Sequence, residues 1–443
     1  PTHPPTTDLH TTLLSSAASD VYKRQRAASP ARVAATKYIY SGNIQVFHVL
    51  LRSLISYRFS QSCLRRGSFF YSYLCPMRRL LSLLAFIFTS WTLASPQVSY
   101  LERPDLLEQA GQCLKHTYGF SFQEARNIQK DLQKATTGHP APLFLEALIV
   151  YWENFPLAPD NEASKEFILL MDQVIELSKV LRDDSLTYTE GVFFDLFARA
   201  FKAMFWADNG KTGKIIPDLG NMYRYTRKGF DLKDQFLEFY FSTGLYNYYI
   251  EAYPEAHPGY KPLVAFMHKG DRELGLKQLH HAINHVIFLR VESLLFMSII
   301  QLKYENDLNS ASIYAQKLVR DYPANIFYRG HLITILLYQQ RYDQVRALLR
   351  SSADQKDNYS KMIGRIATAF MAEKESGDVH LAREAYMEAI ELAEGFGPYA
   401  DTYGAIGYMG LSRLSEQQGL ERDASNYARK ASRLTSYSFI LEN

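Results

Sequence analysis

Two neighbouring histidines are the first residues whose types and spacing could support chemistry. His281 and His285 are four positions apart, so on a helix they share one face, where two imidazoles can bind a metal ion. The helical zinc-protease pattern needs a glutamate directly after the first histidine, but Ala282 stands there, and the sequence identifies no third ligand. We therefore interpret the pair as solvated or packed histidines, and we expect no metal and no cofactor.

Other catalytic patterns are incomplete. Gly210-Lys-Thr212 resembles the end of a phosphate-binding loop, but Phe205 stands where that loop needs a glycine. No Gly-x-Ser-x-Gly sequence occurs, and the spacing of Asp and Glu singles out no pair of carboxylates for hydrolysis. We therefore expect a protein that is not an enzyme.

An aromatic segment is the strongest candidate for binding. It comprises Gly244, Tyr246, Asn247, Tyr248 and Tyr249, and it is followed by Gly270 and Asp271. Tyrosine rings offer a large contact area at little entropic cost and keep a polar tip, which suits recognition of a peptide or a glycan. The alternative, which we favour, is that the rings pack between long helices, with Gly244 allowing a close approach and Asn247 capping or bridging backbone.

Helices must position these residues, because apolar residues recur at helical spacing along nearly all of residues 95–443. Signals for strands are scarce. Short breaks separate the predicted helices, for example at Gly119, at residues 156–159, at residues 208–210 and at residues 321–323. Connections this short are typical of antiparallel helical hairpins.

The C-terminal third is internally repetitive, which is the strongest signal in the sequence. The predicted second helices of successive hairpins carry a small or β-branched residue at Ala311, Val345, Ala382 and Ala424, at intervals of 34, 37 and 42 residues. Such residues are needed there because the two helices of a hairpin cross closely. The other positions that we assign to packing and turning between repeats are Leu318, Pro323, Tyr386, Ala389 and Ala431.

Residues 292–434 resemble tetratricopeptide repeats. Ala382, Tyr386 and Ala389 match the small–aromatic–small positions of the family's second helix, and Pro323 matches its closing proline. Val345 departs from the pattern, and the last interval exceeds the family's usual spacing. The resemblance implies an all-α fold, a right-handed superhelical α-solenoid of antiparallel helical hairpins, with a concave groove that binds peptides or partner proteins.

The preceding part of the chain, residues 95–290, is helical by pattern but matches the repeat consensus poorly. Its predicted helices are longer and more aromatic, as over residues 236–253. The segment 244–249, together with residues 270–276, resembles a signature of exported bacterial tetratricopeptide-like proteins of unassigned function. That resemblance implies a helical array and no particular chemistry. We therefore divide the mature chain into a divergent array, 95–290, and C-terminal repeats, 291–443.

The first 94 residues differ from the rest in charge. They carry 11 Lys and Arg against 2 Asp and Glu, a net charge of +9, whereas the remaining residues carry 38 against 44, a net charge of −6. Residues 1–76 are interpreted as a non-native leader, because Ser16 to Gln25 resembles a translated sequencing adapter; the alternative is a genuine basic leader. Residues 77–94 are predicted to be a signal peptide, with Arg78 and Arg79 before a short apolar core.

These observations predict an exported protein, periplasmic or secreted, of a Gram-negative bacterium, with no integral membrane segment in the mature chain. Its lack of Lys and Arg runs argues against nucleic acid as a partner. The leading hypothesis is a non-enzymatic scaffold that binds a protein or peptide partner in its concave groove. The alternative is a carbohydrate-binding protein or hydrolase on an α-helical toroid. A third is an outer-membrane assembly accessory, which the missing lipid-attachment cysteine argues against.

Overall fold

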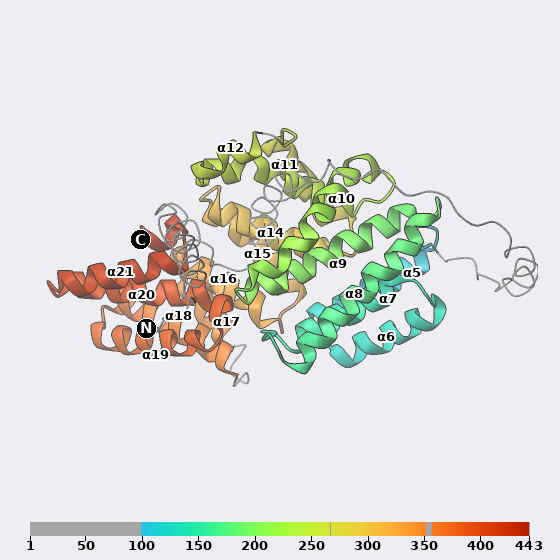
Figure 1. Cartoon of the computed structure of the whole chain (residues 1–443). Helices are drawn as coiled ribbons and strands as arrows, with labels where there is room; N and C mark the ends of the chain where they lie inside the picture. Colours follow the sequence, from blue (N-terminus) through green and yellow to red (C-terminus); the bar gives the residue numbers. More distant parts are fainter. Residues whose placement is uncertain (1–98, 266, 351–356, 443) are drawn as a thin grey trace, which may run out of the picture.

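The computed structural model describes residues 99–265, 267–350 and 357–442 (Figure 1). Helix is the regular structure throughout these ranges, and none of their residues is in a strand. The predicted all-α fold is therefore confirmed. The leader over residues 1–76 and the signal peptide over residues 77–94 lie outside the described residues.

The first half of the array consists of long helices joined by short connections. Its elements are α5 (Pro104–Tyr118), α6 (Phe122–Ala135), α7 (Pro140–Glu153), α8 (Glu162–Asp183), α9 (Tyr188–Asp208), η1 (Thr212–Asp218), α10 (Leu219–Leu232), α11 (Phe239–Ala256), η2 (Pro258–Tyr260), α12 (Lys261–Val264) and α13 (Arg272–His285). The predicted breaks at Gly119 and residues 156–159 fall between helices, and the break at residues 208–210 begins at the last residue of α9.

The second half continues the pattern from the predicted boundary at residues 290 and 291, which lies at the start of α14. Its elements are α14 (Arg290–Lys303), α15 (Leu308–Asp321), α16 (Ile326–Tyr338), α17 (Tyr342–Arg350), α18 (Asn358–Met371), the π-helical turn η3 (Ala372–Ser376), α19 (Val379–Glu394), η4 (Gly397–Ala400), α20 (Asp401–Gln417), α21 (Glu421–Leu434) and α22 (Ser438–Leu441).

Local sequence signals explain where several helices begin and end. Asp271, Asp307, Asn325, Asp357 and Asp378 each precede a helix, and each accepts a hydrogen bond from a backbone N–H of its first turn. Such caps satisfy donors that have no partner inside the helix. These residues therefore set the starts of α13, α15, α16, α18 and α19.

Consecutive helices pack against each other along the chain, which is the arrangement of an α-solenoid. The predicted solenoid is therefore confirmed. Ala311, Val345, Ala382 and Ala424 lie in α15, α17, α19 and α21, the second helices of four successive pairs, and all four are buried. Leu318, Tyr386, Ala389 and Ala431 are buried as well. The exposed Pro323 lies in the connection between α15 and α16.

One predicted helix is displaced. The helix expected over residues 236–253 is α11, Phe239–Ala256, which begins and ends three residues later. It begins later because residues 236–238 form a turn, in which the carboxylate of Glu238 accepts hydrogen bonds from the backbone of residues 287–289. Its end is later as well, since Pro254 lies inside the helix and two further residues follow it in α11.

Aromatic contacts join parts of the chain that are far apart in sequence. Trp152 at the end of α7 lies against Tyr328 of α16, with ring centroids 5.6 Å apart. Phe155, just after α7, lies against Tyr359 of α18 and Tyr399 of η4, at 5.4 and 5.7 Å. Figure 1 shows α5 to α8 at one end and α18 to α21 at the other, so these rings connect the two ends of the solenoid.

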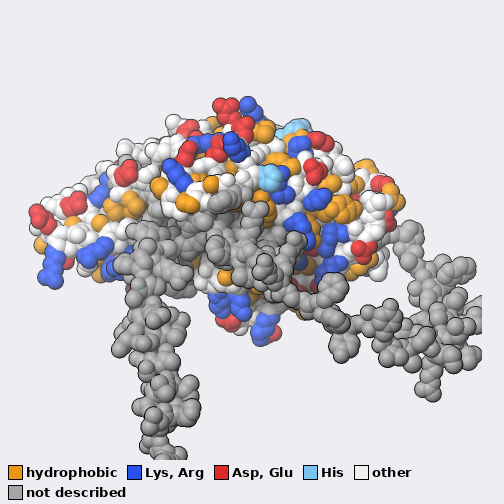
Figure 2. All heavy atoms as spheres, turned by 45° about the horizontal axis from the view of Figure 1, so that its top comes forward, with side chains coloured by type: hydrophobic (Ala, Val, Ile, Leu, Met, Phe, Trp, Pro, Cys, Tyr) orange, Lys and Arg blue, Asp and Glu red, His pale blue; other side chains and the backbone are white. Residues whose placement is uncertain are grey.

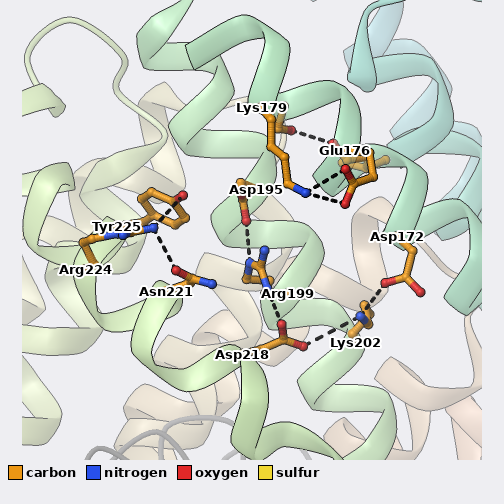
Figure 3. Close-up of polar contacts among 12 residues, drawn as sticks. Asp172, Glu176, Lys179, Asp195, Arg199, Lys202, Asp218, Asn221, Arg224 and Tyr225 are labelled. Carbon is orange, nitrogen blue, oxygen red and sulfur yellow. Dashed lines mark hydrogen bonds and ion pairs between the residues drawn. The ribbon is translucent and has the colours of Figure 1, made fainter. Parts of the chain in front are cut away.

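An ion-pair network fastens α8, α9 and η1 (Figure 3). Arg199 of α9 pairs with Asp195 one turn earlier and with Asp218 of η1. Lys202 pairs with Asp172 of α8 and, at 3.7 Å, also with Asp218. Asp195 is buried and also pairs with Arg182 of α8 at 2.6 Å, so removal of Arg182 or Arg199 would leave its desolvated charge only partly compensated.

Candidate functional site

The aromatic segment lies in the core of the protein. Tyr246, Tyr248 and Tyr249 of α11 are each at most 2 % exposed, and Asn247 is 4 % exposed. The Tyr246 hydroxyl donates to the His268 carbonyl oxygen at 2.8 Å, and the Tyr248 hydroxyl donates to Glu305 at 2.5 Å. Asn247, Tyr248 and Tyr249 therefore face neighbouring elements rather than an open surface. Tyr246 is buried as well, but it also lines a hollow described below.

The glycines of this segment allow α11 and α13 to cross closely. A Cβ atom on Gly244 would lie 3.1 Å from the Gly275 carbonyl oxygen, and one on Gly275 would lie 2.6 Å from the Tyr248 nitrogen. A Cβ atom on Gly270 would overlap Ile250 and lie 2.5 Å from the Asn247 carbonyl oxygen. Backbone meets backbone at these points, so a larger residue would separate the helices.

Polar side chains complete the same crossing. The Asn247 amide donates to Gln278 of α13 at 2.8 Å, and Asp271 caps that helix through the Leu274 N–H at 2.9 Å. Arg272 bonds Glu305, the carboxylate that also holds Tyr248. The structure thus brings all seven residues of the predicted segment together, and their contacts join α11, α13 and the connection that follows α14.

The two candidate metal ligands lie against each other. The rings of His281 and His285 are tilted, with centroids 4.3 Å apart, and the ring of Tyr240 also contacts His281 at 4.3 Å. Burial, followed by the proximity of His285, lowers the pKa of His281. Within the described parts of the chain, no group of three or more His, Cys, Asp or Glu is arranged to hold a metal ion.

The buried residues Ser99, His139 and Glu190 are of the types found in a catalytic triad, but their hydrogen bonds are arranged differently. Ser99 donates to Glu190 at 2.5 Å, and His139 lies 2.9 Å from the same carboxylate. His139 Nδ1 accepts the Ala141 N–H, so Nε2 carries the proton and donates to Glu190. The carboxylate lies between the other two groups, so the imidazole cannot take the hydroxyl proton.

Glu190 instead secures the start of the described chain. It also accepts the backbone N–H groups of Tyr100 and Leu101, each at 3.1 Å. Burial by itself would raise the pKa of Glu190, but the hydrogen bonds from His139, Ser99 and Leu101 keep it below its ordinary value. This set is therefore a structural anchor.

Three adjoining hollows form the candidate binding site, which we call the inner cleft. We name them the apolar, central and polar hollows. Phe201, Met204, Glu292 and Phe296 line both the apolar and the central hollow. Phe327 and Tyr399 line both the central and the polar hollow. The cleft therefore runs from α10 and α11 to α20 and α22, along one face of α14 and α16.

The apolar hollow lies between α9, α10, α11 and α14 and encloses about 880 Å³, including its open mouth. Its wall consists almost wholly of aliphatic and aromatic side chains, among them Phe197, Met222 and Leu245. Glu292 is the one carboxylate on this wall. The central hollow comprises about 460 Å³, including its open mouth, and is lined mainly by rings from α7, α9, α14 and α16.

The polar hollow comprises about 710 Å³, including its open mouth, and combines tyrosine rings with hydrogen-bonding groups. His331 of α16 contacts the Ser298 hydroxyl at 2.9 Å, and burial lowers the pKa of His331 to about 4, so the ring is neutral. Asp208, Thr334 and Tyr403 also line this hollow. Such a wall can offer both flat apolar surface and hydrogen bonds to a ligand.

Sequence reasoning missed most of the cleft. Glu292 and His331 stand in ordinary helical patterns, and Asp208 was noted only as part of a break between helices, so no local motif marks the three as lining residues. They become neighbours of the same space because α9, α14 and α16 face one another in the wound solenoid. Of the predicted segment, only Tyr246 lines a hollow.

Comparison with known proteins does not distinguish between the candidate functions. No protein-family model matches the chain, and no curated protein sequence matches it. Within the described residues, no helix combines the length and apolar character needed to cross a bilayer. Figure 2 shows acidic and basic side chains interspersed on the coloured part of one face. The assignment of the inner cleft as a binding site is therefore based on its geometry alone.

Proposed function

We propose that this chain is a non-enzymatic, tetratricopeptide-like scaffold that binds a segment of a protein or peptide partner in its inner cleft. The observation that carries the proposal is the continuity of the three hollows along α9, α14, α16 and α20. A solenoid presents successive helices at regular intervals, so its inner face suits an elongated ligand.

The chemistry of the cleft favours a partner segment with bulky apolar side chains. Rings of Phe155, Phe327 and Tyr399 line the central hollow, where such side chains would be removed from water. Tyrosine hydroxyls and Thr402 in the polar hollow can pair with the segment's backbone. The net charge of −6 over residues 95–443 favours basic or neutral partners to a modest degree.

We also propose that the protein acts outside the cytoplasm, in the periplasm or as a secreted protein. This part of the proposal is supported by the predicted signal peptide over residues 77–94. A fractionation of a bacterial host that expresses the full chain tests it. Cleavage near Ala94 and recovery in the periplasm or medium are expected, whereas an uncleaved cytoplasmic product would contradict it.

A pull-down from the native cell envelope tests partner binding. Thr402→Trp places a large ring in the polar hollow, and Ser432→Trp on α21, away from the residues that line the three hollows, is the matched control. We expect one specific protein to be recovered by the wild type and the control but not by the cleft variant. Recovery of no specific partner, or equal recovery by both variants, would refute the proposal.

Carbohydrate binding is the second candidate. The polar hollow favours it, because Tyr359, Tyr399 and Tyr403 offer flat rings beside Asp208 and His331, and sugars bind between rings and hydrogen-bonding groups. Thermal unfolding with a panel of oligosaccharides separates the two candidates. A rise in melting temperature that Thr402→Trp abolishes would favour the carbohydrate candidate.

A further inference from the structure

The apolar hollow has features that a polypeptide ligand does not explain. The Ser242 hydroxyl on its wall already donates to the Phe239 carbonyl oxygen at 3.2 Å, and the Tyr246 hydroxyl is bonded to His268. An extended peptide needs partners for its own N–H and C=O groups, because an unpaired backbone group in an apolar site is costly. The wall offers few, so its chemistry fits a ligand that is mostly hydrocarbon.

Glu292 gives this hollow one directed polar group. Its Oε1 accepts a hydrogen bond from the Tyr118 hydroxyl, whereas its Oε2 is buried and has no hydrogen-bond partner among the described residues. A buried oxygen without a partner is unusual and costs free energy. Burial raises the pKa of this carboxyl to about 7, which reflects the same missing solvation.

The composition of the wall agrees with a small-molecule site. Pockets that hold small ligands are mostly apolar with a few well-placed polar groups. The apolar hollow has this composition, with Glu292 as the polar group.

We propose that the apolar hollow binds a small uncharged amphiphile, whose hydrocarbon body fills the space between α9, α10, α11 and α14 and whose hydroxyl group donates a hydrogen bond to Glu292. This site goes beyond the scaffold function and needs no polypeptide partner: a partner segment would lie in the central and polar hollows, and the amphiphile would occupy the apolar hollow. Glu292 also sets the selectivity. A ligand with a carboxylate head would place two negative charges together in an apolar site, which is unfavourable.

A displacement assay on the full chain tests this site. N-phenylnaphthylamine, whose fluorescence rises in apolar surroundings, serves as the probe, and dodecanol and dodecanoate serve as competitors at about pH 8, where Glu292 is ionised. We expect the probe to bind and dodecanol to displace it at least about tenfold better than dodecanoate, a difference of about 1.4 kcal/mol.

Two variants connect the result to the hollow. Ala200→Phe fills the space from α9, and Ala428→Phe, at a half-buried helical alanine of α21 outside the hollow, is the matched control. We expect the first to weaken probe binding at least about tenfold and the second to leave it unchanged. Glu292→Gln keeps an oxygen for Tyr118 but removes the charge, so dodecanoate should then compete nearly as well as dodecanol.

Several outcomes would overturn the proposal. Absence of probe binding, wild-type binding by Ala200→Phe, or equal competition by the two ligands in the wild type would each do so. Better displacement by an apolar hexapeptide would assign the hollow to a polypeptide, and probe loss on dimer formation would assign it to a second copy of the chain. If Ala200→Phe fails to fold, the head-group preference of Glu292→Gln still decides the matter.

Discussion

Glu238 shows how a buried carboxylate can serve the backbone in this protein. It is 2 % exposed and accepts the N–H groups of Ile287, Phe288 and Leu289, at 2.6, 2.8 and 3.0 Å. These three residues form the connection between α13 and α14, where no helical partner is available for them. One side chain thus satisfies the donors of a segment about 50 residues away in sequence.

The first prediction concerns this carboxylate. Glu238→Ala leaves three N–H groups without their acceptor, and each buried unsatisfied group costs about 1–3 kcal/mol. We therefore expect a loss of at least about 3 kcal/mol in the free energy of unfolding, measured by urea denaturation. Glu273→Ala, at an exposed ion pair with Lys277 on α13, should change it by less than about 0.5 kcal/mol. Similar losses in both variants would contradict this role.

Glu292 leads to a prediction about pH. Its pKa is about 7 in the folded protein against an ordinary value of 4.5, so between these values the folded state binds more protons than the unfolded state. The stability that it contributes is therefore complete below pH 4.5 and is lost as the pH rises to about 7.

Glu292→Gln checks this assignment, because glutamine does not titrate. The difference in unfolding free energy between wild type and variant should shift against the wild type from about pH 5 to about pH 8, and then level off. Urea denaturation at a series of pH values measures it. A difference that is independent of pH would show that Glu292 titrates as it does in the unfolded chain.

At the scale of elements, helices and their pairing could be predicted from sequence, because the relevant signals are local. Apolar spacing marks the buried faces, and Gly119 and Asp378 mark helix ends. Small residues such as Ala382 and Ala424 mark helix crossings, and both are buried. The start of α11 was not predictable, because it depends on Glu238 and its distant partners.

The crossing of α19 and α20 provides a test at this scale. A Cβ atom on Gly410 would lie 2.2 Å from the ring of Tyr386, whose hydroxyl is held by Glu373 at 2.7 Å. Gly410→Ala should therefore destabilise the protein by about 2 kcal/mol, despite the better helix propensity of alanine. Gly364→Ala in α18 meets no atom within 4 Å and should stabilise it by about 0.5–1 kcal/mol.

Thermal or urea unfolding of these two variants distinguishes crowding from helix propensity. Both substitutions add the same methyl group inside a helix, so a difference in sign isolates the contact with Tyr386. Stabilisation by both variants would mean that Tyr386 can move aside, and that the crossing of α19 and α20 tolerates a larger residue than glycine.

At the scale of the whole molecule, the inner cleft depends on how the solenoid is wound. Tyr118 touches Tyr322, and Asn325 donates to the Tyr118 carbonyl oxygen at 3.2 Å, across more than 200 residues. Sequence periodicity reports which face of a helix is buried but not which distant helix it meets. The cleft therefore could not be predicted from the sequence, although each of the helices that line it could.

Phe155 is the residue through which this winding can be tested. It follows α7 and meets Phe327, Tyr359 and Tyr399, which belong to α16, α18 and η4. Phe155→Ala removes these contacts together and should cost about 2–3 kcal/mol. Phe122→Ala at the start of α6 is the matched control, because among the rings of the described residues that half-buried ring contacts only Phe120.

Hydrogen exchange locates the effect of that change. In a solenoid whose helices contact only their neighbours along the chain, loss of Phe155 would increase exchange only in α7 and α8. Because the ring joins the two ends, we expect α18 and α20 to exchange faster as well, while Phe122→Ala affects α5 and α6 alone. Unchanged exchange in α18 and α20 would mean that the two ends are stable independently, and that the central hollow is a gap between them rather than part of one cleft.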